Sequence, residues 1–330
     1  MTAASPGGAT RTPGDALVSR ARELVHAGRL AEARPVLDEA AQLHHQAGDA
    51  KGEVVCLRLG ATISRLLGDL PGAAERAERS ARLASPGSRE AIAAASEQAD
   101  IDAASGDFAS AAARASDAVE TAELSGWEGQ PLADLLRQRA RLLALDGQTD
   151  AALREMARIT ALFAGDRDGR QLWARVEQAT ALLGAGKRGA ARDIVEEVRA
   201  SAQPKGDHPL LAQLALLDVA DRVGQGDIAA ALRAAEVASE ESLEAGSPLV
   251  YAAAALALAT LADRVGDRLR AYATLASAMV TLGDKIGKPE SRAIVEPVLI
   301  ELRDRWGAKD FAGVKASYED QRREALRRSS

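Results

Sequence analysis

Small and apolar residues return at fixed distances from eight glycines spread along the chain. Each glycine is followed five residues later by an alanine, and successive glycines are 38 to 41 residues apart. The position nine residues after each glycine is always apolar, and the position seven before it is usually alanine. The glycines are Gly28, Gly68, Gly106, Gly147, Gly186, Gly226, Gly266 and Gly307. This spacing predicts helix pairs, each joined at a glycine and stacked into a solenoid.

The residues around each glycine explain how one helix ends and the next begins. Glycine adopts the left-handed backbone conformation that a side chain disfavours, so it suits the end of a helix. Aspartate follows four of the glycines, at Asp69, Asp107, Asp227 and Asp267, where it can cap the next helix. Alanine-sized residues on both sides of the turn let two antiparallel helices approach closely. We therefore expect an all-α superhelix of about eight helix hairpins.

The expected helices begin after a lead-in over 1–14, which is rich in glycine and proline and which we expect to be disordered. We expect the pairs at 15–27 and 31–47, 51–67 and 71–84, 88–105 and 109–125, 129–146 and 150–164, 168–184 and 189–202, 208–224 and 228–245, 248–264 and 268–286, and 290–306 and 309–328. The last helix is far more polar than its counterparts, so 309–330 suits a capping helix. Because the repeat is unbroken, we interpret 15–330 as one elongated domain.

Two turns carry the strongest resemblance to a known repeat. They read Gly28-Arg29-Leu30-Ala31-Glu32-Ala33 and Gly106-Asp107-Phe108-Ala109-Ser110-Ala111. Together with the small residue in the first helix, they resemble the tetratricopeptide repeat (TPR). The period near 40 residues exceeds the 34 typical of that family, so the helices are longer, and the family's aromatic residue in the first helix is mostly missing. The resemblance implies a concave groove lined by first helices, and longer repeats of this kind resemble those in bacterial signal-responsive regulators.

Composition narrows the classes of function. The net charge of −6 argues against nucleic-acid binding, which needs a basic surface. The single cysteine, Cys56, forms no internal disulfide. The first residues lack the basic and apolar regions of a signal peptide, and no apolar stretch is long enough to span a bilayer. We expect a soluble cytoplasmic protein, from a bacterium because lysine is scarce and asparagine absent, and leave its oligomeric state open.

No group of residues predicts catalysis or metal binding. Adjacent His44 and His45 point in different directions on a helix, and His26 and His208 lie elsewhere along the chain. Cys56 has no histidine near it in sequence, and acidic pairs on helices are typical of solvated faces. We therefore expect no enzyme, cofactor or metal.

The predicted groove supplies the candidate binding residues. Position six before each glycine is held by Arg22, Thr62, Asp100, Arg141, Thr180, Ala220, Thr260 and Glu301. From this face we select Arg58, Glu97, Asp100, Arg137, Arg141, Trp173 and Glu177, although the same residues also fit ordinary solvated positions and Trp173 also fits a core. Charges of both signs beside an aromatic suit a protein or peptide with charged groups and an apolar anchor. The leading interpretation is a non-enzymatic interaction scaffold; the alternative is a regulator that senses a peptide or small metabolite by changing superhelix shape.

Overall fold

The computed structural model describes residues 12–166 and 169–329 of the 330-residue chain. These residues form sixteen α-helices and one short 3-10 helix, with no strand among them. The chain divides into two compact units, one ending at Asp166 and the other comprising the residues after it. We call them unit 1 and unit 2 and describe each by itself.

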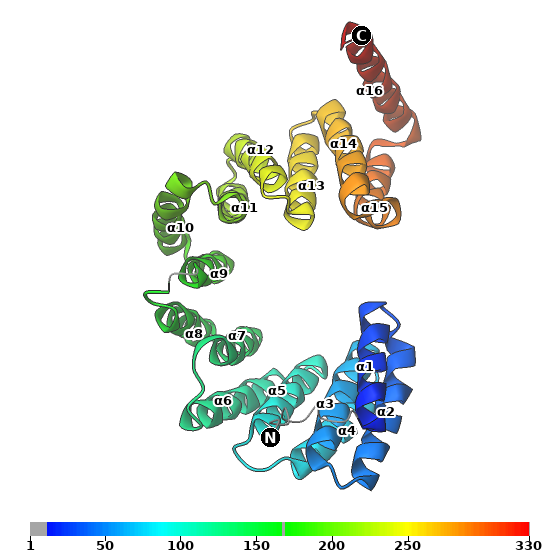
Figure 1. Ribbon diagram of the computed structural model, residues 1–330. Coiled ribbons are helices and arrows are strands. Elements are labelled where there is room, and N and C mark those ends of the chain that lie inside the picture. Colours follow the sequence, from blue (N-terminus) through cyan, green and yellow to red (C-terminus); the bar gives the residue numbers. More distant parts are fainter. Residues whose placement is uncertain (1–11, 167–168, 330) are drawn as a thin grey trace, which may run out of the picture. The chain divides into compact units, whose positions relative to one another are not determined.

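Unit 1 contains four helix hairpins, which Figure 1 shows in blue to green. The helices are α1 (Pro13–His26), α2 (Leu30–Gln46), α3 (Ala50–Leu66), α4 (Leu70–Leu83), α5 (Arg89–Ala104), α6 (Phe108–Leu124), α7 (Gly129–Leu145) and α8 (Thr149–Leu162). Each helix packs on the next, and the first helices α1, α3, α5 and α7 also contact one another in turn. The first helices therefore form one continuous layer, which positions the candidate site.

Unit 2 repeats this arrangement from α9 to α15. Its helices are α9 (Arg170–Gly184), α10 (Arg188–Ala202), α11 (His208–Gln225), α12 (Ile228–Glu244), α13 (Pro248–Arg264), α14 (Arg268–Ile286), α15 (Lys288–Trp306) and α16 (Ala308–Ser329). The 3-10 helix η1 (Gln203–Lys205) joins α10 to α11. Here α9, α11, α13 and α15 form the layer of first helices.

The turns have the backbone that the sequence predicts. In the first seven hairpins the repeat glycine has φ between 73° and 86°, the left-handed region that favours glycine. The residue after it closes the helix end by donating to a carbonyl five residues back, as in Asp107 N to Asp102 O at 3.0 Å. All four predicted aspartate caps are present; the carboxylate of Asp69, for example, accepts from Gly72 N at 3.0 Å.

The shared small positions are packing positions, as expected. The alanine five residues after the glycine is at most 7% exposed in the first seven hairpins, and the residue seven before it is buried in all seven. The last pair differs, because Gly307 alone joins α15 to α16. In that pair Ala312 is exposed and Ile300 is 49% exposed, while Leu302 and Trp306 are buried instead.

The helix boundaries confirm the sequence prediction to within two residues at each end. The predicted disordered lead-in lies largely outside the described residues; Pro13 and Gly14 already belong to α1. No helix in the described chain is both long and apolar enough to cross a membrane. The single elongated domain over 15–330, with a capping helix at 309–330, stays a prediction.

Candidate functional site

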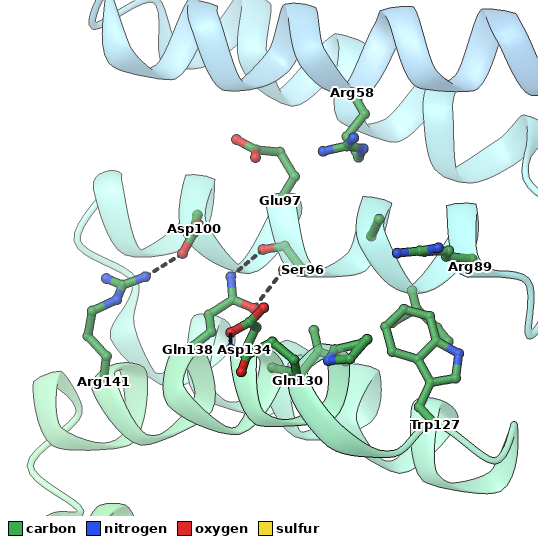
Figure 2. Close-up of a pocket in the computed structure, with 14 residues that line it drawn as sticks. Arg58, Arg89, Ser96, Glu97, Asp100, Trp127, Gln130, Asp134, Gln138 and Arg141 are labelled. Carbon is green, nitrogen blue, oxygen red and sulfur yellow. Dashed lines mark hydrogen bonds and ion pairs between the residues drawn. The ribbon is translucent and has the colours of Figure 1, made fainter. Parts of the chain in front are cut away.

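A pocket of about 680 Å³ lies on the layer of first helices of unit 1, between α3, α5 and α7. Figure 2 shows the side chains that reach into it. Its lining contains both polar and apolar side chains. The lining residues are Arg58, Arg89, Ile92, Ala93, Ser96, Glu97, Asp100, Trp127, Gln130, Pro131, Asp134, Leu135, Gln138 and Arg141. We call this the α3–α5–α7 pocket.

Arg89 and Trp127 enter this pocket from the beginnings of α5 and α7. Ser88 caps α5 by accepting from Ala91 N at 3.1 Å, which makes Arg89 the first residue of that helix. One repeat later, Trp127 follows the turn after α6, where its backbone N–H donates to Ala122 at 2.9 Å. The guanidinium of Arg89 therefore lies over the indole ring of Trp127, 5.9 Å from its centroid (Figure 2).

The acidic residues of the pocket are held by neighbouring helices. Glu97 on α5 is buried and accepts from Thr62 Oγ1 at 2.7 Å and from Arg65 Nε at 2.9 Å, both on α3. Asp100 forms an ion pair with Arg141 on α7, and Arg65 lies 3.7 Å from its other oxygen. These bonds tie α3, α5 and α7 together, since an ion pair with a buried carboxylate resists separation.

Gln138 and Asp134, which also line the pocket, have hydrogen-bond partners as well. Gln138 exchanges two bonds with Ser96, accepting from its hydroxyl at 2.7 Å and donating to its carbonyl at 2.8 Å. Asp134 accepts from Gln130 at 2.7 Å and from Arg137 at 2.9 Å. Arg58 and Arg89 have neither a carboxylate nor a hydrogen-bond partner for their guanidinium groups among the described residues. The pocket therefore carries two uncompensated positive charges.

The structure brings together four of the seven residues singled out from sequence. Arg58, Glu97, Asp100 and Arg141 line the pocket, while Arg137 pairs with Asp134 on its own helix. Trp173, which is 39% exposed, and half-buried Glu177 lie on α9 in unit 2.

The pocket residues that the selection from sequence left out include Arg89 and Trp127, which follows the turn between α6 and α7. Both stand near the start of a first helix, far from the repeat glycine that guided the selection. Extending the comparison of first helices back to their N-terminal ends would have found them.

The side chains that most often bind metals or act as nucleophiles were the next candidates. Across residues 12–166 and 169–329, no group of three or more His, Cys, Asp and Glu side chains could hold a metal ion. Burial raises the pKa of the Cys56 thiol to about 11, so it is protonated and inert at neutral pH. His44 is buried too, where Nδ1 lies 2.8 Å from Asp49 Oδ2.

Comparison with known proteins gives matches at the level of structure. No protein-family model matches the chain, and a search of curated proteins finds no match. Among solved structures, the apo form of RapI gives a TM-score of 0.57 at 10% identity, covering 95% of this chain and 97% of its own. The apo form of the quorum sensor NprR from B. thuringiensis gives 0.52 at 12% identity, over 89% and 82%.

A signal transduction ATPase with numerous domains and a tetratricopeptide repeat sensor, from Pyrococcus horikoshii, gives a TM-score of 0.59 at 13% identity. This match covers 86% of the present chain and 44% of that protein. The chain is a TPR-like helical repeat. Its long hairpins, about 40 residues each, follow the predicted long-period form. At identities this low the likeness concerns the fold, and function has to be argued from the pocket.

Proposed function

We propose that this TPR-like chain is a non-enzymatic interaction scaffold that binds an acidic segment of a partner protein or a peptide in the α3–α5–α7 pocket. The observation that carries the proposal is the pair of guanidinium groups on Arg58 and Arg89 that lack an anionic partner in the described chain. Guanidinium binds carboxylate with two parallel hydrogen bonds, so it selects both charge and orientation.

The rest of the pocket fits this ligand better than a basic one. Glu97, Asp100 and Asp134 already accept bonds from arginines of the chain, so their charges are neutralised locally. Trp127, with small contributions from the largely buried Ile92 and Leu135, gives apolar surface next to the free charges. An acidic segment with an apolar or flat side chain would use both, a recurring mode of peptide recognition.

The three arginines selected from sequence, Arg58, Arg137 and Arg141, have different roles in this proposal. Arg141 and Arg137 are engaged with Asp100 and Asp134, so we assign them to holding the pocket's walls. Arg58 keeps its proposed role, and Arg89 replaces the other two. Trp173 and Glu177 remain candidates for a contact made by unit 2.

A sensor is the second candidate function, and one observation favours it. Arg65 and Arg141 hold Glu97 and Asp100, so the spacing of α3, α5 and α7 depends on ion pairs at the edge of the binding pocket. A bound anion competes for these arginines and would change that spacing. RapI, the quorum sensor NprR and the P. horikoshii protein with a repeat sensor share the fold, which makes a regulator that senses a peptide or small metabolite a natural alternative.

Peptide display on the purified chain tests the proposal and requires no identified partner. We expect selected peptides to be rich in Asp and Glu, to bind more weakly as salt rises, and to lose roughly 10–100-fold in affinity to the variant R58E/R89E. The control R233E/R264E changes two exposed arginines of unit 2 that have no partner in the described chain, and so alters net charge equally. Selection of basic peptides, or equal loss with the control, refutes the proposal.

Ligand-induced changes separate the scaffold from the sensor. A scaffold binds its peptide with little change in the distance between α3 and α7, whereas a sensor changes it. Spin labels at exposed Leu67, directly after α3, and at exposed Leu145, the last residue of α7, would report that distance in the free and peptide-bound chain.

A further inference from the structure

A second pocket in unit 1, of about 150 Å³, lies between α1, α2 and α3 and has a different chemistry. Its walls are almost entirely apolar. They come from Ala21, Val25, Leu30, Leu37, Leu59, Ile63 and Leu66, with Arg22, His26 and Thr62 at its edge. We call this the α1–α3 pocket. Val25 and Leu66 are 40% and 59% exposed although they line it, so apolar surface remains open to water.

The repeat shows why this space is open. Counted from the repeat glycine, Val25 on α1 corresponds to Arg65 on α3, and Leu59 on α3 corresponds to Glu97 on α5. Between α3 and α5 these two positions hold the Arg65–Glu97 ion pair. Between α1 and α3 the same positions hold shorter apolar side chains, which leave a cavity in place of the ion pair.

The edge of the pocket is positively charged. Arg22 and His26 stand one turn apart on α1, both exposed, and neither has a hydrogen-bond or ion-pair partner among the described residues. None of the lining residues is a carboxylate. The hydroxyl of Thr62 donates to Glu97 at 2.7 Å, so it is not available to a ligand as a donor. An occupant with an apolar body and a nearby negative charge matches this surface.

We propose that the α1–α3 pocket binds one apolar side chain, Phe- or Leu-sized, of an acidic segment. As the anchor of that segment it rests on the proposed function, because α3 carries both this pocket and Arg58. The size agrees, since an apolar cavity of about 150 Å³ accommodates a benzene-sized group. Arg22 binds a carboxylate next to the anchor, as Arg58 and Arg89 do farther along the layer of first helices.

Methyl NMR of the full chain tests this pocket separately from the larger one. Ile63 lines the α1–α3 pocket, Ile92 lines the α3–α5–α7 pocket, and Ile228 lies in unit 2 as an internal control. The probe is 4-phenylbutyrate, which carries a phenyl ring and one carboxylate. We expect it to shift the Ile63 methyl with an affinity on the order of millimolar, as befits a fragment, and to leave Ile92 and Ile228 unmoved.

Two substitutions and a neutral probe assign the interactions. V25E should weaken 4-phenylbutyrate binding about tenfold or more, since it puts a negative charge beside the ligand. The control V280E makes the same change at an exposed valine of unit 2 and should have no effect. The amide 4-phenylbutanamide should bind a few-fold more weakly than the acid, and R22Q should remove that preference.

The outcomes separate this inference from the proposed function. An unmoved Ile63 methyl at about 10 mM probe, or binding that survives V25E, overturns the inference and leaves the α3–α5–α7 pocket untouched. The anchor role is also overturned if selected acidic peptides shift Ile92 but bind V25E as tightly as wild type. If instead no acidic peptide shifts Ile92 while the probe shifts Ile63, the proposed function fails and the apolar pocket stands.

Discussion

The layer of first helices has a different surface in the two units, although the repeat is the same. At ten, nine and six residues before the repeat glycine, α3, α5 and α7 carry five charged side chains: Arg58, Glu97, Asp100, Arg137 and Arg141. At the same positions α11 and α13 carry Leu216, Leu217, Ala220, Leu256, Ala257 and Thr260, none of them charged. One repeat therefore builds a charged pocket on α3, α5 and α7 of unit 1 and an uncharged face on α11 and α13 of unit 2.

This difference shows which positions specify the fold and which specify binding. The glycine and the alanine five residues after it are shared by both units, and that alanine is buried in the first seven hairpins. The positions on the first-helix face differ in charge from repeat to repeat, while the glycine turn and the alanine stay the same. A substitution at the shared alanine should thus lower the stability of either unit alike. A substitution on the first-helix face should affect only the binding by the unit that carries it.

The largest expected effect is on packing. Ala111 and Ala231 hold the same position in units 1 and 2, and both are fully buried. Leucine at either site would overpack the helix contact and lower the free energy of unfolding by roughly 1–3 kcal/mol. A312L is the matched control, because this alanine is exposed in the last helix pair and should tolerate the change. Equal melting temperatures for A111L, A312L and wild type would show that the register of the repeat is misassigned.

Sequence supplied most of the fold because the packing signal repeats eight times in phase. The helix ends and the aspartate caps depend on residues adjacent to each turn, so they could be predicted locally. The candidate site could not be predicted as fully. Arg58 and Arg141 were both selected from sequence as binding residues. Only the structure shows that Asp100 forms an ion pair with Arg141. That pairing links residues 41 positions apart, on helices whose separation the pattern does not give.

The next prediction concerns the ion pair between α3 and α5, which two substitutions would replace with apolar side chains. E97L removes the partner of Arg65, whose side chain is only 21% exposed, and should cost about 1–2 kcal/mol of unfolding free energy. The double variant R65V/E97L reproduces the apolar pair found between α1 and α3, so it should recover most of that loss. Chemical denaturation of the single and double variants measures both. A double variant no more stable than E97L would contradict the view that these positions are exchangeable.

A helix cap gives a smaller effect that depends on pH. Asp49 accepts from Gly52 N at 3.0 Å, and this bond, with the nearby His44, lowers the pKa of the Asp49 carboxyl. A lowered folded-state pKa contributes stability above the unfolded pKa, which is lost as the pH falls through the folded value. D49A should therefore cost about 1 kcal/mol at pH 7 and less as the pH falls below about 4. A cost that grows on acidification would contradict this assignment.

The smallest expected effect is spectroscopic. Trp127 lies in the α3–α5–α7 pocket beside Arg89, whereas Trp173 lies on α9 in unit 2. A bound acidic peptide should change tryptophan emission in wild type and in W173F, and should leave the emission of W127F nearly unchanged. The reverse pattern would move the binding site to unit 2 and restore the candidates Trp173 and Glu177.

The most direct test compares two pairs of arginines that carry the same charge. R58Q/R89Q removes the charges of the α3–α5–α7 pocket that have no partner in the described chain, and R233Q/R264Q removes the same number of charges from exposed arginines of unit 2. Isothermal titration with a display-selected acidic peptide should give roughly 10–100-fold weaker binding for R58Q/R89Q and a loss of about threefold or less for R233Q/R264Q. Equal losses, or a larger loss for R233Q/R264Q, would contradict the account.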